Sequence, residues 1–445
     1  MSRSNSVSAT PFEATITDLS HDGRGVARVD GKALFVSGAL LGERVMARLR
    51  KRHRHFDEAE VVEVISPSPH RVEPRCRHFA ECSGCSLQHL DAEAQIAAKQ
   101  RVLAENFERI GKVVPKAWLP PLTGEPWAYR RKGRLSVRHV LKKGRVLVGF
   151  REEANPRFVA DIQQCEVLHP AIGPKVGLLA ELINGLDAVD AIAQIEFAGG
   201  DDTMALVFRH LQPLGEADLA ALTAFGQQHD LAIYLQPGNN SSVHPLWPAQ
   251  PRLAFRIASD DARFADVELE FEPLDFVQVN ANMNQRMVAH AMALLDPQPT
   301  DRVLDLFCGL GNFTLPIARR VAEVVGVEGE HGLVQRAAHN AAHNGIDNAS
   351  FHVANLFEDQ RASEWARTPW DKILLDPPRA GADQLLACLP HRKTRRVVYV
   401  SCHPASLARD AGILVNQHGF TLASAGVMDM FPHTAHVESI ALFER

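Results

Sequence analysis

The sequence predicts an α/β protein in three parts: a small β-barrel in residues 12–69, a β-rich segment in residues 70–270, and a doubly wound parallel sheet in residues 271–445. Two patterns support this division. Short β-like runs separated by glycine turns fill the first part, whereas in the last part apolar runs alternate with helical stretches and end in polar residues. The chain has 445 residues, 46% of them hydrophobic and 23% charged, so it is long enough to bury several cores.

Five β-like runs predict the N-terminal barrel. They are Ala14–Thr17, Val26–Val29, Ala33–Val36, Glu43–Leu49 and Ala59–Ile65. So many strands in so short a stretch favour a small closed barrel. Pro67 and Pro69 then mark a linker, because alternating prolines block both a helix and a central strand.

Seven cysteines, an odd number clustered unevenly, argue against a disulfide framework. Cys76, Cys82 and Cys85 follow the linker closely, and Cys165 stands far downstream. Four thiolates can hold either an iron–sulfur cluster or a tetrahedral zinc ion, and the spacing alone does not choose between them.

Two basic runs stand out although the net charge is −5. The first lies between Arg48 and Arg54, and the second, Arg130–Arg145, holds eight lysines and arginines and no acid. Such runs are ordinarily solvated faces, but two of them in one chain favour contact with phosphates. Between them, residues 92–110 have the apolar spacing of an amphipathic helix, which we expect to pack on the C-terminal domain.

The glycine turn in Arg302–Phe313 is the centre of the C-terminal part. The apolar run before it fits a buried parallel strand, and glycines after a strand let a backbone approach a nucleotide-like ligand closely. Glu328 ends the next run, where a carboxylate meets ribose hydroxyls in doubly wound folds. Asn355 and Asp376 end the following two runs, at the sheet edge where ligands bind.

The turn from Asp305 to Phe313, together with Glu328 and the Pro-Pro pair that follows Asp376, resembles class I S-adenosylmethionine-dependent methyltransferases. The Ser-Cys-His-Pro motif at Cys402, the His-Val-Glu-Ser motif at Glu438 and the Phe-Val-Gln-Val-Asn motif at Gln278 are similar to RNA uridine-C5 methyltransferases. Because C5 of uracil is a poor nucleophile, a thiolate must first add to C6, and a base must later remove the C5 proton.

This resemblance covers residues 275–445 and implies roles for individual side chains. Cys402 is the expected nucleophile and Glu438 the expected base. Gln278 is an expected cofactor contact, although its amide is also suited to cap the helix that begins near Asn282. The other residues expected to bind S-adenosyl-L-methionine are Phe307, Gly309, Asn312, Glu328, Asn355 and Asp376.

With its Leu40–Val45 segment and the glycine turn that follows Asp22, the N-terminal part is similar to the TRAM domain, an OB-like barrel that binds RNA. The cysteine pattern is similar to the [4Fe-4S] cluster of ribosomal-RNA members of the same family, which implies that Cys76, Cys82, Cys85 and Cys165 are its ligands. We therefore identify the chain as a member of the RumA/RlmD group, whose barrel and cluster together separate it from relatives that act on transfer RNA.

The expected activity is methylation of a specific uridine C5 in 23S ribosomal RNA. Three alternatives remain: another uridine or a transfer RNA as target, a catalytically inactive RNA-binding assembly factor, and a cluster-dependent radical methylase. No apolar run approaches the length of a membrane span, and residues 1–10 are too polar for an export signal. We therefore expect a cytoplasmic monomer that does not bind membranes.

Overall fold

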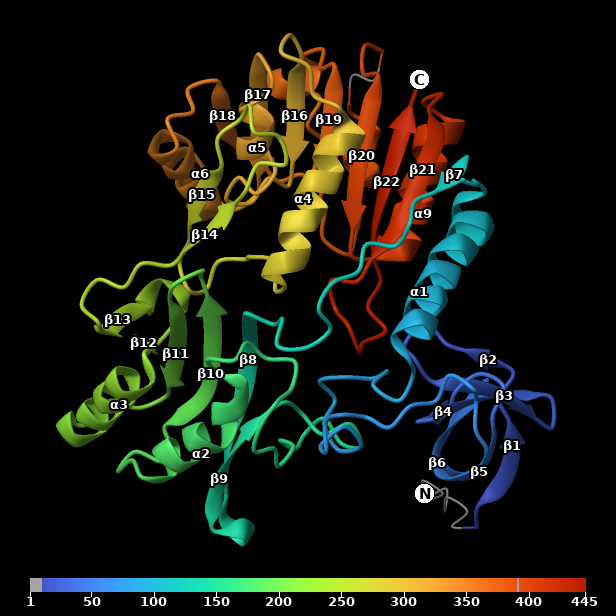
Figure 1. The fold of residues 1–445 in the computed structure, drawn as a ribbon, viewed down its shortest axis with the longest axis vertical. Coiled ribbons are helices and arrows are strands. Elements are labelled where there is room, and N and C mark those ends of the chain that lie inside the picture. Colours follow the sequence, from blue (N-terminus) through green and yellow to red (C-terminus); the bar gives the residue numbers. More distant parts are fainter. Residues whose placement is uncertain (1–9, 390–391) are drawn as a thin grey trace. The chain divides into compact units, whose positions relative to one another are not determined.

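The computed structural model describes residues 10–389 and 392–445. The chain forms two compact units (Figure 1). The first unit holds the chain up to Val102 with Arg151–Phe158 and Phe431–His436, and the second holds Leu103–Phe150, Val159–Met430 and Val437–Arg445. Residues 1–9, which include most of the polar start, lie outside the described residues. Among the described residues, no helix combines the length and the apolar character needed to cross a membrane.

The first unit contains the predicted barrel. Its sheet has the strand order β1-β5-β6-β4-β3-β2. Because β1 and β2 follow each other directly while β1 pairs with β5 and β2 with β3, the two ends of the sheet meet and the barrel closes. The strands are β1 (Phe12–Thr15), β2 (Asp18–Leu19), β3 (Gly25–Val29), β4 (Lys32–Ser37), β5 (Arg44–Arg52) and β6 (Phe56–Ser66).

Strict alternation along β5 explains both the barrel core and the first basic run. Val45, Ala47 and Leu49 point inward and are buried, whereas Arg48 and Arg50, at alternate positions, point outward and are exposed. Arg48 and Arg50 both pair with Glu60 of β6. Part of the basic run is therefore neutralised by the neighbouring strand.

The segment after the barrel is irregular and leads into α1 (Ala92–Asn106). Asp91 caps this helix, since its Oδ1 accepts a hydrogen bond from the Ala94 backbone at 2.8 Å. A π-helical turn, Phe107–Gly111, continues α1 and belongs to the second unit. There Gly111 lies against α9 (Pro404–Asn416), and a Cβ on Gly111 would come within 2.3 Å of the Ala408 carbonyl oxygen.

The second unit begins with a six-stranded sheet of order β13-β12-β11-β10-β8-β9. Helices α2 (Val176–Asn184) and α3 (Glu216–His229) contact each other and so cover the same face. The strands are β8 (Lys132–Val140), β9 (Arg145–Gly149), β10 (Ile192–Gly199), β11 (Met204–His210), β12 (Ala232–Gln236) and β13 (His244–Trp247).

A hairpin, β14 (Ala254–Ile257) and β15 (Val267–Glu270), connects this sheet to the rest of the unit. Asn340 and Asn344, on and just after α6 (His331–His343), each bind both the N–H and the C=O of a β15 residue. These four bonds fix the hairpin on the helix although β15 pairs with no strand of the larger sheet.

The larger sheet has eight strands in the order β18-β17-β16-β19-β20-β22-β21-β7. The first five strands in this order, from β18 through β17, β16 and β19 to β20, are parallel, as predicted from their apolar runs. Strand β22 runs antiparallel between β20 and β21. The strands are β7 (Ala117–Trp118), β16 (Arg302–Leu306), β17 (Glu323–Glu328), β18 (Ala349–Val353), β19 (Lys372–Leu375), β20 (Arg396–Ser401), β21 (Thr421–Met428) and β22 (Glu438–Glu444).

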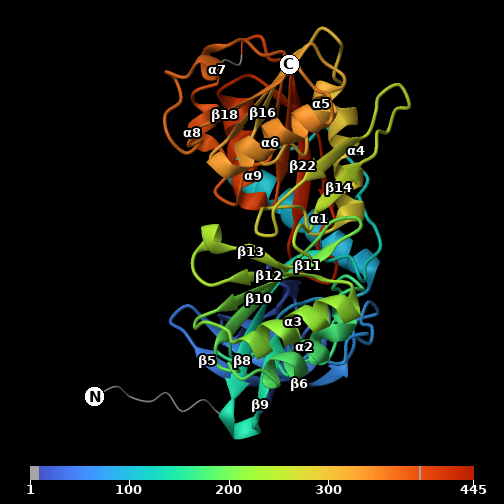
Figure 2. The same cartoon turned by 90° about the vertical axis from the view of Figure 1, so that its left-hand side faces the viewer.

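Helices cover both faces of this sheet (Figure 2). Helices α4 and α5 contact each other, as do α8 and α9. The sheet is thus doubly wound, and its parallel strands deliver their carboxyl ends to one edge. The remaining helices are α4 (Ala281–Leu295), α5 (Thr314–Ala318), α7 (Glu364–Arg367), α8 (Asp383–Leu386) and α9 (Pro404–Asn416).

Candidate active site

The turn between β16 and α5 forms the centre of the candidate site. Phe307, Gly309 and Gly311 all have positive φ, at 63°, 55° and 98°. Nothing lies within 4 Å of the position that a Cβ of Gly309 would take, so a ligand can approach the backbone there. Cys308 is buried, and a Cβ on Gly326 would lie 2.9 Å from its sulfur, so it packs beneath the turn.

Glu328 is held rigidly beside this turn. One carboxylate oxygen accepts the Gly309 N–H at 3.1 Å, and the other accepts the N–H groups of Gly329 at 2.6 Å and Glu330 at 3.1 Å. A carboxylate bound by three backbone donors has a fixed direction before any ligand arrives. This arrangement suits recognition of paired hydroxyls at the glycine turn.

Two further carboxyl groups make the site electronegative. Burial raises the pKa of Asp305 to about 7, and the charges of Asp376 and Glu328 add to that rise. Thr314 donates to one oxygen of Asp305, while the other oxygen is buried without a hydrogen-bond partner among the described residues. Asp376 keeps some exposed surface but is densely surrounded by protein, and this desolvation raises its pKa to about 7. Such a cluster favours a cationic ligand.

Asp305 was not among the residues predicted to bind the cofactor, because it stands inside an apolar run that indicates only a buried strand. Phe357 was also missed. It is 48% exposed, and its ring centroid lies 5.8 Å from that of Phe307. Two aromatic rings near the carboxyl ends of β16 and β18 offer a flat apolar surface. The sequence signal that could have identified Phe357 was an aromatic residue two positions after the predicted Asn355.

The two predicted asparagines have partners within the protein. Asn312 and Asn284 of α4 exchange two amide hydrogen bonds, at 2.9 and 3.0 Å, so Asn312 ties the glycine turn to α4. Asn355 donates to Glu358 and accepts from the Phe357 backbone. The alternative capping role for Gln278 is wrong, because Asn280 is the N-cap of α4 and accepts the Met283 N–H at 3.1 Å.

Cys402 and Glu438 meet through strand register. Ser401 of β20 is opposite Ser439 of β22, so the next residues outward, Cys402 and Glu438, are cross-strand neighbours. Burial raises the pKa of the Cys402 thiol to about 11, with further rises from the charges of Glu438 and Asp376 and a lowering from Arg379. The sequence predicted both residues but not that adjacent strands bring them together.

Helix α9 supports the loop that follows Asp376. Ser406 donates to the Arg379 carbonyl at 2.9 Å, and Asp410 accepts the Ala382 N–H at 2.7 Å. Asp410 also accepts the hydroxyl of Tyr399 from β20 at 2.6 Å. The loops after β19 and β20 are therefore fixed to one helix that begins two residues after Cys402.

Three of the predicted cluster ligands, Cys76, Cys82 and Cys85, lie in the irregular segment of the first unit, and Cys165 lies in the second unit. The Gly84 N–H donates to the Cys82 sulfur at 3.4 Å. The donor set is thus suited to a soft, sulfur-binding metal group.

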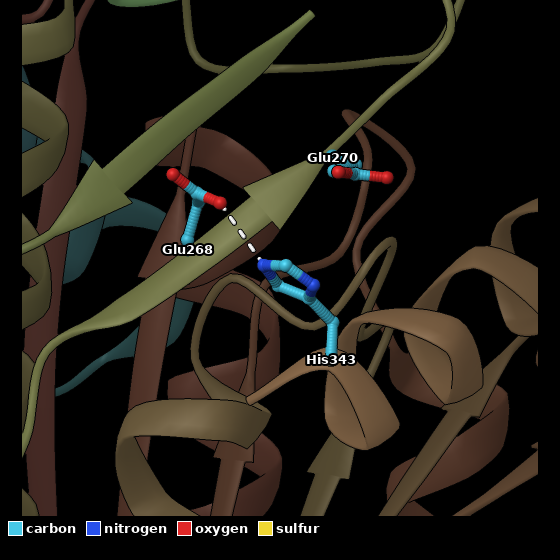
Figure 3. Close-up of side chains that lie close together, drawn as sticks. All are labelled: Glu268, Glu270 and His343. Carbon is cyan, nitrogen blue, oxygen red and sulfur yellow. Dashed lines mark hydrogen bonds and ion pairs between the residues drawn. The ribbon is translucent and has the colours of Figure 1, made fainter. Parts of the chain in front are cut away.

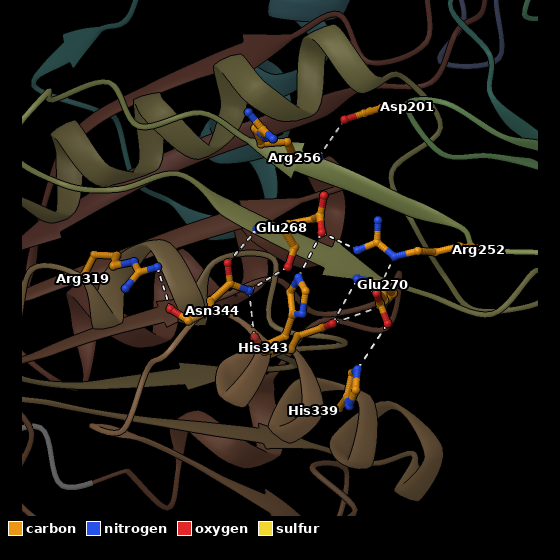
Figure 4. Close-up of polar contacts among 10 residues, drawn as sticks. Asp201, Arg252, Arg256, Glu268, Glu270, Arg319, His339, His343 and Asn344 are labelled. Carbon is orange, nitrogen blue, oxygen red and sulfur yellow. Dashed lines mark hydrogen bonds and ion pairs between the residues drawn. The ribbon is translucent and has the colours of Figure 1, made fainter.

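Glu268, Glu270 and His343 form a separate group whose ligand-type atoms lie within 4.8 Å of one another (Figure 3). Arg252 binds both glutamates, while His343 contacts Glu268 at 3.0 Å and His339 contacts Glu270 at 3.2 Å (Figure 4). The hydrogen bonds from Arg252 lower the pKa of Glu268. Arg252 therefore balances the negative charge of these two carboxylates, and the group holds β15 against α6.

The second basic run is only partly a surface feature. Arg131 is 3% exposed and Lys132 is half-buried, so neither lies on an open face. Farther along, Lys143 and Arg145 both pair with Asp161. The expectation that the whole run faces phosphates is wrong for Arg131, because its side chain is directed into the fold.

Comparisons with known proteins agree with the fold and the motifs. The model of the tRNA (Uracil-5-)-methyltransferase family matches residues 263–445, and that of the TRAM domain matches residues 10–62. The 23S rRNA (uracil(1939)-C(5))-methyltransferase RlmD of Xanthomonas euvesicatoria pv. vesicatoria (strain 85-10) is 61% identical over 99% of both chains. The RlmD protein of Stenotrophomonas maltophilia (strain K279a) is 60% identical over the full length of both chains.

Among solved structures, the tRNA (uracil-54, C5)-methyltransferase of Pyrococcus abyssi in complex with S-adenosyl-L-homocysteine has the same fold. Its TM-score is 0.72 at 23% identity, over 97% of this chain and 100% of that chain. The identity to the RlmD proteins extends over essentially the whole length of the chain, barrel included. The chain therefore belongs to the family of RlmD 23S rRNA (uracil-C5)-methyltransferases.

Proposed function

We propose that this protein methylates C5 of a uridine in 23S ribosomal RNA, the one numbered 1939 in the names of its relatives, with S-adenosyl-L-methionine as methyl donor. The observation that carries the proposal is the strand register that places Cys402, one residue beyond the Ser401–Ser439 pair, beside Glu438 at the sheet edge that also holds the glycine turn. A thiol and a carboxylate side by side are the two groups that methylation of a pyrimidine carbon requires.

The donor would bind over the glycine turn. When bound, S-adenosyl-L-methionine supplies an electrophilic methyl group on a positively charged sulfur. Gly309 leaves room for its close approach, Glu328 is directed for its ribose hydroxyls, and Phe307 with Phe357 offers an apolar surface for its base. The carboxyl groups of Asp305 and Asp376 would balance its positive charge. Gln278, Asn312 and Asn355 complete the set of proposed contacts.

Cys402 would begin the reaction by forming a bond from its sulfur to C6 of the uracil. The electron pair of the C5–C6 double bond moves onto C5 and the O4 enolate, which makes C5 a nucleophile able to take the methyl group. Because the pKa of Cys402 is about 11 in the protein alone, the thiol must lose its proton before this addition. Arg379, whose charge lowers that pKa, would help to stabilise the thiolate.

Glu438 would complete the reaction. After the methyl group has reached C5, that carbon still carries its original proton, which the Glu438 carboxylate removes. The electron pair of the C5–H bond then restores the C5–C6 double bond, and the sulfur of Cys402 leaves with the pair of the S–C6 bond. The product is 5-methyluridine, and the enzyme is left with a thiolate and one added proton.

Four cysteines, Cys76, Cys82, Cys85 and Cys165, would hold a [4Fe-4S] cluster. The support is their sulfur donor set, the order of the cysteines along the chain and the backbone hydrogen bond to the Cys82 sulfur. Every step assigned to Cys402 and Glu438 moves electron pairs, so the cluster would be structural. The TRAM barrel and the exposed members of the two basic runs would contact RNA phosphates.

The test uses a 23S ribosomal RNA fragment with 5-fluorouridine at the target position. Fluorine at C5 cannot leave as a proton, so the wild-type protein should form a stable covalent adduct with the fragment in the presence of methyl donor. Cys402→Ala should form none, and a transfer RNA transcript with 5-fluorouridine is the matched control for substrate class. An adduct with Cys402→Ala would refute the nucleophile, and an adduct with the transfer RNA alone would refute the substrate.

A further inference from the structure

The segment of residues 273–280 joins the β14–β15 hairpin to α4 and carries Gln278. It forms no strand of the larger sheets, and apart from the exposed Phe276 its residues are buried or half-buried. Phe276 is 67% exposed, whereas Asp275 and Asn280 are buried. A segment outside a sheet needs other partners for its backbone if its side chains are to be held in one place.

Residues 130–132 supply those partners. The backbone N–H of Arg131 donates to the Val279 carbonyl at 2.8 Å, and its side-chain Nε donates to the Gln278 carbonyl at 3.0 Å. Lys132 donates from Nζ to the Pro273 carbonyl at 2.6 Å. Two consecutive carbonyl groups, one of them belonging to Gln278, are thus held by a single arginine.

The environment of Arg131 indicates a positioning role more than a contribution to stability. Its side chain is 4% exposed, and the carboxylate nearest to it, Asp201, is 4.0 Å away from its Nη1. The other oxygen of Asp201 accepts the Arg256 backbone N–H at 2.8 Å (Figure 4). The guanidinium Nη2 has no hydrogen-bond partner among the described residues. A buried charge with such incomplete pairing destabilises a fold relative to an apolar side chain of similar size.

The rest of the guanidinium is held in place. Its carbon lies 4.5 Å from the centre of the Phe255 ring, in the β14 strand. The Arg131 carbonyl accepts the Gly199 N–H at 2.8 Å, at the end of β10. The arginine is therefore fixed by the central sheet and the hairpin, and it transmits that fixed position to the backbone of Gln278.

We propose that Arg131 is a positioning residue for the methyl transfer: it fixes the backbone of Gln278 so that the Gln278 amide is directed into the active site. This proposal rests on the role of Gln278 in the proposed function. Displacement of a catalytic contact by about 1 Å can lower a rate about 100-fold, so a backbone bond outside the site can control the reaction.

The decisive test is a double-mutant cycle of Arg131→Met and Gln278→Ala, measured as kcat for transfer of labelled methyl groups to the 23S fragment. Arg131→Met alone should lower kcat about 10- to 100-fold. In the Gln278→Ala background it should have no further effect, because the side chain that it positions is gone. Equal losses in both backgrounds would overturn the proposal.

A second readout is independent of activity. Hydrogen exchange of the peptide that spans residues 273–280 should become faster in Arg131→Met. Arg131→Lys keeps the charge but not the Nε donor, so it should show the same faster exchange and replaces Arg131→Met if that variant fails to fold. Arg320→Met, which removes another largely buried arginine that pairs with Asp260, is the matched control and should leave both this exchange and kcat unchanged. Exchange at the wild-type rate in the Arg131 variants would show that the restraint does not exist. An inactive wild-type protein would instead refute the proposed function.

Discussion

Replacing Glu438 with glutamine should make the Cys402 thiol more reactive even while it stops turnover. The pKa of Cys402 is about 11, raised by burial first and then by the charges of Glu438 and Asp376. At pH 7 the thiolate fraction is therefore about one in 10⁴, and it rises about tenfold for each pH unit until it approaches the pKa. Alkylation by iodoacetamide follows the thiolate, so its rate in the wild-type protein should rise in the same way between pH 7 and pH 10.

Glu438→Gln removes a negative charge beside the thiol while nearly preserving the shape of the side chain. The pKa of Cys402 should fall, which moves the whole rate profile to lower pH; each unit of displacement raises the rate at a fixed pH about tenfold. Arg379→Met removes the charge that lowers the same pKa and should move the profile in the opposite direction. Opposite movements in the two variants distinguish electrostatics from a general loosening of the site.

The assay is mass spectrometry of the peptide that contains Cys402, because the chain has seven cysteines and bulk thiol consumption would mix them. Cys308 provides an internal control, since its burial raises its pKa well above the ordinary value and shields it from reagent. A wild-type profile that reaches its plateau at or below pH 8, or slower alkylation in Glu438→Gln than in the wild type, would refute the reasoning.

Three other predictions test different parts of the molecule. Glu438→Gln should transfer the methyl group but retain the RNA on Cys402, seen as a methylated covalent adduct in a denaturing gel; free methylated RNA at the wild-type rate would exclude Glu438 as the base. Asp305→Asn should raise the melting temperature at pH 8 but not at pH 4, and it should weaken binding of the methyl donor in calorimetry. The pKa of Asp305 in the folded protein, about 7, lies above the ordinary 3.8, so the native state loses up to about 4 kcal/mol of stability as the pH rises through that interval. Equal melting shifts at both pH values would contradict this. Cys82→Ser should remove the brown colour and the iron of the purified protein and weaken RNA binding, whereas a colourless wild-type protein with stoichiometric zinc would contradict the cluster.

The sequence predicted the parallel strands well because each is a short apolar run that ends in a polar residue. The positions of Glu328 and Asp376 at strand ends followed from that pattern. The role of Asp305 did not follow from the pattern, because one carboxylate inside an apolar run gives no sign that one of its oxygens is buried without a hydrogen-bond partner among the described residues. The closeness of Cys402 to Glu438 also could not be predicted, since it depends on the return of β22 beside β20.

The second basic run shows a different limit of sequence reasoning. Consecutive arginines and lysines indicate charge but not direction, and along an extended chain successive side chains point to opposite sides. Arg134 is accordingly exposed, whereas Arg131, three residues earlier, is buried and bound to the Gln278 carbonyl. Hydrogen bonds between segments 147 residues apart leave no trace in local composition.

The place of β22 in the larger sheet has a consequence for biosynthesis. This strand is translated after every other strand of the sheet, yet it lies inside, between β20 and β21. Until it emerges from the ribosome, β20 and β21 each have an edge of unpaired backbone groups, which invites association with other nascent chains. Its insertion closes both edges and delivers Glu438 to Cys402 in a single event, so the nascent protein cannot acquire its base before its sheet is complete.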